Sequence, residues 1–183
     1  MKYYHKNRDV LYRYNMKEFK KYALMFVILF LLIFDFSYLT YLHYAKNHST
    51  VCSIKSSFNC DIVNKSSYSE FLGIPVATLG ILSSLILIFL VYKILKRKDT
   101  RFRGYALYLS LINILFSSYL IRIELFVLKT FCIFCLAADF LIFIFSIFVI
   151  SLNKENKLLY KISIIISGIF IILIIYTIFR AIQ

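Results

Sequence analysis

The chain has 183 residues, of which 61% are hydrophobic, and it carries a formal net charge of +13. A soluble domain is about 45–50% apolar, and a disordered basic tail is poor in the Phe, Ile and Leu that abound here. The composition therefore excludes both classes. Because the polar residues lie in short blocks between long apolar runs, the pattern is typical of a multi-pass membrane protein.

Five apolar runs are each long enough to cross a membrane. About 20 apolar residues span a hydrocarbon core of about 30 Å as a helix, in which every backbone polar group finds a partner within the segment. We therefore expect an all-α membrane protein. Pro75, near the start of the second run, is tolerated in a first helical turn. The predicted spans, in chain order, are Tyr22–Leu42, Gly73–Tyr92, Gly104–Leu128, Phe131–Leu152 and Ile162–Phe179.

The basic residues lie mainly on one side of these spans. Sixteen of the 22 Lys and Arg fall before the first span, between the second and third, or between the fourth and fifth. Because cytoplasmic loops carry the excess of Lys and Arg, we expect a cytoplasmic N-terminus and a non-cytoplasmic C-terminus. The pattern argues against nucleic-acid binding, since the charges flank spans and no soluble segment is long enough to read a nucleic acid.

This topology divides the chain into three segments. Residues 1–21 are predicted to form a basic cytoplasmic N-terminal segment. Residues 22–152 are predicted to contain the first four spans and the extracytoplasmic loop 43–72. Residues 153–183 are predicted to form a cytoplasmic loop and a fifth transmembrane helix. No internal repeat and no Gly- or Pro-rich linker separates a second domain.

All four cysteines are predicted on the non-cytoplasmic side. Cys52 and Cys60 lie in the loop 43–72, and Cys132 and Cys135 open the fourth span. In bacteria this is the oxidising side, where disulfides persist. A C-x-x-C spacing at a helix N-terminus brings two sulfurs onto adjacent turns, where the helix dipole stabilises a thiolate. The thiolate is the nucleophile of disulfide exchange, and apolar spans around Cys135 suit a lipid-soluble redox ring.

Three interpretations of the cysteines remain open on the residues alone. In a redox relay, the polar segment that carries Cys52 and Cys60 would meet a soluble partner and then the buried pair. The cysteines would otherwise form two structural disulfides, or together hold one structural zinc ion. No His completes a familiar zinc pattern, and one pair lies at a membrane boundary. We therefore favour the relay and expect no metal site.

The order of these residues resembles the vitamin K epoxide reductase family, particularly its bacterial members. The loop cysteines are followed by the motif S-x-Y-S-x-x-x-G-I-P-V over residues 66–76, then by Leu79-Gly80, and about fifty residues later by the C-x-x-C. The match covers roughly residues 22–152. The resemblance implies a four-helix bundle around a membrane quinone of the menaquinone or ubiquinone type, with the loop as an extracytoplasmic cap. It also implies the cytoplasmic membrane of a bacterium.

The resemblance further implies a role for each cysteine. Cys135 would face the quinone, and Cys132 would exchange with Cys60 through a mixed disulfide. Cys52 would take electrons from a thioredoxin-like extracytoplasmic protein. Ser66 matches a Ser or Thr of the family whose hydroxyl lies at the quinone site, where it would donate a hydrogen bond to a quinone oxygen. On the residues alone, Ser66 is equally a turn or cap residue.

The chain departs from the family at two positions. Vertebrate members that reduce the epoxide carry an Asn where this chain has Val76, and a Tyr where it has Asp139. Both differences favour quinone reduction over epoxide reduction. Many bacterial members carry a thioredoxin-like domain after the fifth span, whereas this chain ends four residues beyond Phe179. The resemblance therefore implies that the thioredoxin-like partner is a separate protein.

Ionisable residues within the spans are functional candidates, because a charge is costly in hydrocarbon. Asp139 follows Cys135 by one turn on the same helical face, so it either relays a proton during quinone reduction or hydrogen-bonds a neighbouring helix. Asp35 lies in the first span with no partner identifiable from sequence. Arg122 and Glu124 lie near the outer interface, where long side chains reach water at little cost.

The predicted activity is a quinone-dependent thiol oxidoreductase that supports disulfide bond formation. The competing class is a non-enzymatic membrane scaffold with structural disulfides or a zinc site made by the four cysteines. Reduction of vitamin K epoxide is a third hypothesis.

Overall fold

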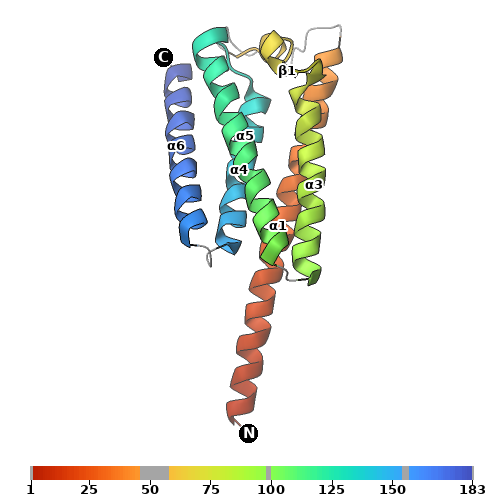
Figure 1. The fold of residues 1–183 in the computed structure, drawn as a ribbon, viewed down its shortest axis with the longest axis vertical. Coiled ribbons are helices and arrows are strands. Elements are labelled where there is room, and N and C mark those ends of the chain that lie inside the picture. The colour runs from red at the N-terminus through yellow and green to blue at the C-terminus, as the bar shows by residue number, and fades with distance from the viewer. Residues whose placement is uncertain (1, 46–57, 98–99, 154–156, 183) are drawn as a thin grey trace.

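The computed structural model describes residues 2–45, 58–97, 100–153 and 157–182. The long helices run side by side as a bundle, and the short elements gather at one end of it (Figure 1). The elements, in chain order, are α1 Lys2–Tyr44, α2 Cys60–Asn64, η1 Ser67–Ser69, β1 Glu70–Phe71, β2 Ile74–Pro75, α3 Val76–Arg97, α4 Thr100–Arg122, the π-helix η2 Ile123–Leu128, α5 Ile133–Leu152 and α6 Lys157–Ile182.

Four helical stretches of the described chain are long and apolar enough to cross a membrane. They coincide with the first four predicted spans, so the prediction of a mostly helical, multi-pass membrane protein is confirmed. α6 occupies the fifth predicted run and packs against α4 and α5. That α6 crosses the membrane stays a prediction. The four stretches are Phe19–Tyr44, Val76–Lys96, Arg101–Leu128 and Ile133–Leu152.

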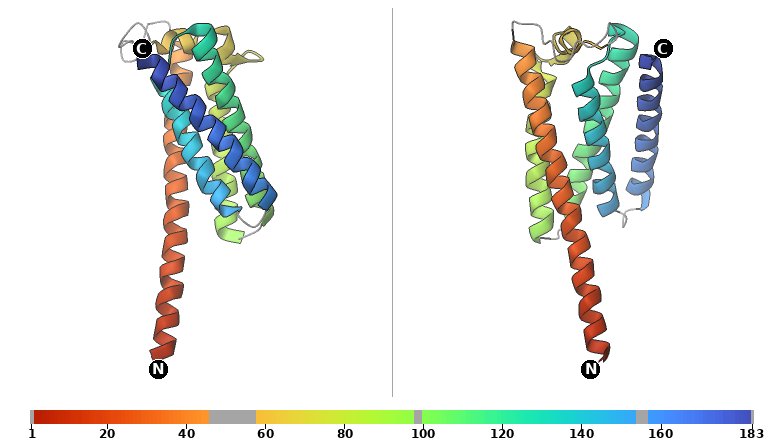
Figure 2. Two further views of the ribbon diagram at one scale, coloured as in Figure 1. Left: turned by 90° about the vertical axis from the view of Figure 1, so that its left-hand side faces the viewer. Right: turned by 180° about the vertical axis from the view of Figure 1, so that it is seen from behind.

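α1 joins the basic N-terminal segment to the first span as one continuous helix. Its 43 residues make a rod of about 65 Å at 1.5 Å rise per residue, roughly twice the thickness of the hydrocarbon core. The N-terminal half of α1 therefore extends well beyond the other helices (Figure 1, Figure 2). The cytoplasmic location of residues 1–21 stays a prediction.

The second span starts slightly later than the sequence predicts. Pro75 lies in the short strand β2 and not in a first helical turn, and α3 begins at the next residue, Val76. Proline suits a strand edge because it has no N–H to donate to a ladder. β1 and β2 form a tight antiparallel hairpin, whose turn residues Leu72 and Gly73 have φ of 54° and 77°.

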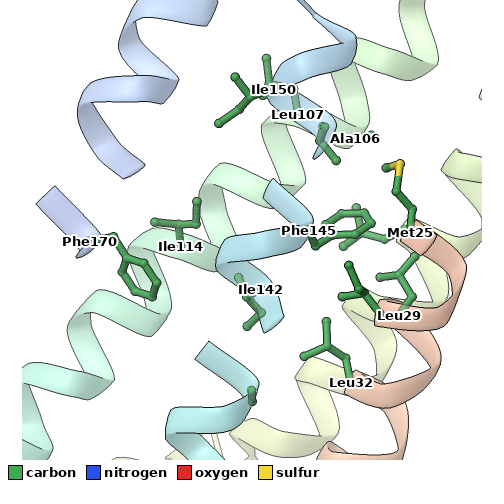
Figure 3. Close-up of a cluster of buried hydrophobic side chains, with 14 of the residues drawn as sticks. Met25, Leu29, Leu32, Ala106, Leu107, Ile114, Ile142, Phe145, Ile150 and Phe170 are labelled. Carbon is green, nitrogen blue, oxygen red and sulfur yellow. The ribbon is translucent and has the colours of Figure 1, made fainter. Parts of the chain in front are cut away.

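The core of the bundle lies where α1, α3, α4 and α5 meet. α1 packs most extensively against α3, and α4 packs against both α5 and α3. Phe145 of α5 is almost fully buried and points toward Met25 and Leu29 of α1 (Figure 3). The ring of Phe170 on α6 lies 5.8 Å from that of Phe143 on α5. Many outward-facing side chains are also apolar and exposed, as expected of helices whose outer surface contacts lipid.

α2, η1 and the hairpin of β1 and β2 lie across one end of the bundle (Figure 1). α2 begins at Cys60 because the side chain of Asn59 caps it and accepts from the N–H groups of Asp61 and Ile62 at 3.0 and 3.2 Å. At the other end of α2, Asn64 donates through Nδ2 to the carbonyl of Leu39 at 2.6 Å. These hydrogen bonds fix α2 against the end of α1.

His43 of α1 makes a second attachment to the same segment. Its Nδ1 lies 2.6 Å from the carbonyl oxygen of Asn64, and its Nε2 lies 3.2 Å from the carboxylate of Glu70. One side chain of α1 therefore connects to both α2 and the β hairpin.

Replacing His43 by phenylalanine is expected to loosen this segment without unfolding the bundle. The loss of two hydrogen bonds should cost about 1–2 kcal/mol of local stability. Hydrogen exchange of the amides in residues 60–71 measures this cost as faster exchange. Tyr44→Phe, at an exposed neighbouring position, is the control and should leave the exchange unchanged. Equal exchange in both variants would show that His43 does not hold the segment.

Candidate functional site

A cavity of about 440 Å³ lies between the four helices and residues 63–71, which precede α3. This volume falls within the range of small-molecule sites. Most of its wall is apolar, and Cys135 forms part of it. The polar side chains on the wall are, in chain order, Asn64, Ser66, Tyr68, Ser69, Ser83, Ser84, Ser110, Asn113, Ser117, Glu124, Asp139 and Ser146.

The structure brings three predicted site residues together on this wall, namely Ser66, Cys135 and Asp139. Ser66 precedes η1, and its hydroxyl donates to the carbonyl of Val63 at 2.8 Å. The hydroxyl therefore makes a local turn contact while its residue also lines the cavity. To donate to a ligand, it would have to rotate away from Val63.

Asp139 hydrogen-bonds a neighbouring helix, as one of the two alternatives from the sequence has it, while a role in proton relay stays a prediction. Its carboxyl accepts a hydrogen bond from Ser117 of the neighbouring helix α4, and it also lines the cavity. Only 7% of the residue is exposed. Asp35 of α1, for which the sequence identified no partner, lies close enough to Asp139 to interact with it electrostatically. Within the described chain, Oδ2 of Asp35 is buried without a hydrogen-bond partner.

Cys132 and Cys135 lie at the start of α5, as their spacing predicted. Cys132 is the N-cap residue, and its sulfur accepts the N–H of Cys135 at 3.2 Å. Cys132 is fully buried, whereas Cys135 is half-buried and faces the cavity. Both residues pack in the cluster at this end of the bundle, and of the two only Cys135 also lines the cavity.

Cys60 and Cys132 belong to one buried cluster at the end of the bundle. A short parallel pairing of two chain segments brings them there. Phe58 pairs with Phe131, and the N–H of Asn59 donates to the carbonyl of Phe131 at 3.0 Å. Phe58 lies two residues before Cys60, and Phe131 lies directly before Cys132. The pairing therefore holds the start of α2 beside the start of α5.

The cysteines are in different oxidation states. Cys60 is disulfide-bonded, whereas Cys132 and Cys135 are free thiols. Cys52, the outermost cysteine of the predicted relay, lies outside the described residues. Within the part of the chain that the structure describes, no three His, Cys, Asp or Glu side chains are grouped so that they could hold a metal ion.

Residues 23–152, more than half of the chain, match the vitamin K epoxide reductase family. The chain belongs to this family. It is accordingly an oxidoreductase with several membrane-spanning helices. Among individually curated proteins, none matches the chain. The matched residues run from the first span to the end of α5, so they contain the cavity and all four cysteines.

The two departures from the epoxide-reducing members of the vitamin K epoxide reductase family both lie on the cavity wall. Val76 of α3 and Asp139 of α5 line the same space.

The sequence interpretation of Glu124 was wrong in one respect. Glu124 does not extend to water, because it is only 3% exposed, and it lines the cavity. Its Oε2 accepts the N–H of Cys132 at 3.4 Å. Arg122, two residues earlier, is exposed as expected. The available signal was an acidic residue within a span. Because that residue lies near an interface, the sequence did not show that its side chain faces the interior of the bundle.

Sequence reasoning also missed a polar pair deeper in the cavity. Ser83 of α3 donates to Oδ1 of Asn113 on α4 at 3.0 Å, and Nδ2 of Asn113 donates back to the serine oxygen at 2.9 Å. A signal was present, because Ser110, Asn113 and Ser117 follow one another at spacings of three and four. Residues at such spacings share one helical face, and here that face lines the cavity.

Proposed function

We propose that this protein is a quinone-dependent thiol oxidoreductase that supports disulfide bond formation. Electrons would pass from a thioredoxin-like extracytoplasmic protein to the pair Cys52–Cys60, then to the pair Cys132–Cys135, and finally to a membrane quinone. One observation carries the proposal. The start of α5 presents Cys135 to the cavity and Cys132 to the buried cluster that contains Cys60.

Each transfer between cysteine pairs is a thiol–disulfide exchange. The donor dithiol first reduces the disulfide of Cys60, for which we propose Cys52 as the partner. The Cys60 thiolate then attacks the sulfur of Cys132 in the Cys132–Cys135 disulfide, which forms a Cys60–Cys132 bond and releases the Cys135 thiolate. Cys52 next attacks Cys60 and releases the Cys132 thiolate. Two electrons have then moved to the inner pair, and the loop disulfide has formed again.

The cavity suits a quinone ring. It has the volume of a small-molecule site and a mainly apolar wall, which carries the thiol of Cys135 and, among its hydroxyls, that of Ser66. A quinone of the menaquinone or ubiquinone type supplies a two-electron acceptor when bound. Cys135 would contact the ring, and Ser66 would hydrogen-bond a ring oxygen. Asp139 would hold or release a proton at its carboxyl, since reduction of a quinone to a hydroquinone takes up two protons.

We also propose the membrane topology that the basic residues predict. The N-terminus of α1 and the start of α5 lie at opposite ends of the bundle (Figure 2). With the N-terminus in the cytoplasm, the cysteines and the cap formed by residues 43–72 lie on the extracytoplasmic face of a bacterial cytoplasmic membrane. α6 has 26 residues and packs beside α4 and α5, which supports its assignment as a fifth span.

The competing functions fit the site less well. A zinc site made by four cysteines requires four thiolates, whereas Cys60 is disulfide-bonded. A scaffold with two static disulfides does not require free thiols at Cys132 and Cys135 beside a cavity. Reduction of vitamin K epoxide is disfavoured because Val76 and Asp139 replace the amide and the phenol on the wall.

Dithiol-dependent quinone reduction by the purified full chain tests the proposed function. With dithiothreitol as donor and a short-chain quinone as acceptor, we expect continuous turnover. Thiol trapping by a maleimide reagent should show Cys132 and Cys135 becoming reduced with the donor and oxidised again with the quinone. Cysteines that do not change state, or one zinc ion bound per chain, would instead establish the scaffold.

A further inference from the structure

Glu124 is a buried acid that the relay described above does not use. It lies on η2, where the helix of the third span widens from α to π geometry before it ends at Lys129 in the left-handed conformation. Such π segments are frequent at functional sites. A carboxyl in a membrane-spanning segment is costly to bury, yet Glu124 is only 3% exposed. A cost of this kind points to a role for the acid.

The contacts of Glu124 connect it to the inner cysteine pair. Its Oε2 accepts the N–H of Cys132 at 3.4 Å. Its side chain lines the cavity together with Cys135 and Asp139, and it interacts electrostatically with both. The carboxylates that form ion pairs within the described chain are Glu70 and Asp61, so no cation of that part neutralises Glu124.

Oxidation of the inner pair has a proton requirement that this position meets. One S–S bond forms, two S–H bonds break, two electrons pass to the acceptor, and two protons must leave sulfur. Cys132 is fully buried, so its thiol cannot lose the proton directly to solvent water. Thiols react as thiolates, so a nearby carboxylate that accepts this proton accelerates ring closure of the disulfide.

We propose that Glu124 accepts the proton of the Cys132 thiol when the Cys132–Cys135 disulfide closes. The inference rests on the proposed function for its physiological acceptor but not for its test. Glu124 passes the proton to the cavity, whose wall it shares with Asp139, and the proton leaves with the reduced quinone. When the loop cysteines reduce the pair again, Glu124 returns a proton to Cys132.

A disulfide dye allows closure to be observed without quinone. The full chain carries Cys52→Ser and Cys60→Ser, so that only the inner pair reacts. 4,4′-Dithiodipyridine reacts first with the more accessible Cys135, which forms a mixed disulfide and releases one thiopyridone. Cys132 then attacks that mixed disulfide, closes the Cys132–Cys135 bond and releases the second thiopyridone. The second absorbance phase in stopped flow is therefore the closure rate.

Glu124→Gln is the informative substitution, because the amide oxygen can still accept the N–H of Cys132 but the side chain cannot take up a proton. We expect the closure rate at pH 6.5 to fall about a hundredfold, the scale of general base catalysis, and the difference to narrow toward pH 9 as solvent base takes over. Glu124→Asp should recover most of the rate. Arg122→Gln, exposed on the same helix, is the matched control and should close at the parent rate.

Three results would overturn the proposal. One is closure in Glu124→Gln at the rate of Arg122→Gln over the whole pH range. Another is a loss of equal size at every pH that Asp does not restore, because this shows a purely structural effect. The third concerns the parent and serves if Glu124→Gln does not fold. We expect the closure rate of the parent to change less than about threefold between pH 6 and 8. A rise of about tenfold per pH unit would instead show that the Cys132 thiol ionises without a base.

The same experiment separates this inference from the proposed function. If the parent shows a base-assisted closure phase but no dithiol-dependent quinone reduction, the quinone assignment fails and the role of Glu124 stands. If the parent reduces quinone but Glu124→Gln closes at the parent rate, the role of Glu124 fails and the quinone assignment stands.

Discussion

Replacing Cys135 by alanine is expected to abolish quinone reduction, with a loss of at least about a thousandfold, because a covalent nucleophile has no substitute once its thiol is removed. Cys135 is the one cysteine among the described residues that lines the cavity. Cys132 is fully buried in the cluster with Cys60 and does not line it. Without Cys135, electrons from the donor have no thiol through which to reach the ring.

The same variant should keep the contact between the two cysteine pairs. Cys132 remains beside Cys60, so its thiolate can attack the Cys52–Cys60 disulfide at Cys60, which forms a Cys60–Cys132 disulfide and releases the Cys52 thiolate. When a maleimide blocks the released Cys52, which would otherwise reverse the exchange, mass spectrometry should detect the Cys60–Cys132 disulfide. Ile133→Ala, between the two cysteines and outside the cavity wall, is the matched control and should keep quinone turnover within about twofold. Undiminished quinone turnover in Cys135→Ala would refute the proposed function.

Replacing Gly80 by alanine is expected to destabilise the bundle by about 1–3 kcal/mol, the usual cost of overpacking. A Cβ at Gly80 would lie 2.8 Å from three carbons of the Phe36 ring, whereas optimal carbon–carbon contacts lie at about 3.5–4.0 Å. Gly80 and Phe36 lie where α3 packs on α1, the most extensive helix contact of the bundle. Small residues at such interfaces allow helices in membranes to approach closely.

Two other glycines provide the controls for this substitution. Gly104 of α4 and Gly168 of α6 have no atom within 4 Å of an added Cβ. Alanine at either position should be neutral or stabilising by up to about 1 kcal/mol, since glycine weakens a helix interior. Unfolding in mixed detergent micelles measures the difference. Phe36→Leu combined with Gly80→Ala should regain stability. If Gly80→Ala is as stable as Gly104→Ala, the proposed clash is absent.

The Gly80 substitution should also affect the candidate site. Both Phe36 and Gly80 line the cavity, so a displaced ring changes the shape of the wall. We therefore expect weaker quinone binding in Gly80→Ala than in Gly104→Ala. Quinone turnover measured at several quinone concentrations detects this as a higher KM.

The membrane spans were predictable because they depend on local composition. A run of about 20 apolar residues forms a helix in lipid whatever its neighbours are, since no other open structure satisfies its backbone. That Cys132 and Cys135 lie at the start of α5 was predictable for a similar reason, because they open such a run. The start of α3 was misjudged by three residues, since the pairing of β2 with β1 decides where Pro75 lies.

The surroundings of Glu124 were not predictable in the same way. Position in the sequence placed it near an interface, and interfacial glutamates usually reach water. The π geometry of η2 and the close approach of the start of α5 instead put its carboxylate beside the N–H of Cys132. Both depend on how α4 and α5 pack, and no local pattern of apolar residues encodes that packing.

The sequence by itself therefore determined the membrane class, the first four spans, the C-x-x-C at a helix start and the family. These features depend on short stretches of chain and on spacing. Only the tertiary structure decided that Cys60 lies with Cys132, that Ser66, Cys135 and Asp139 share one cavity, and that Glu124 faces inward. The physical reason is that these contacts join residues far apart in the chain. They arise from which helix faces pack together, and in lipid nearly every face is apolar enough to do so.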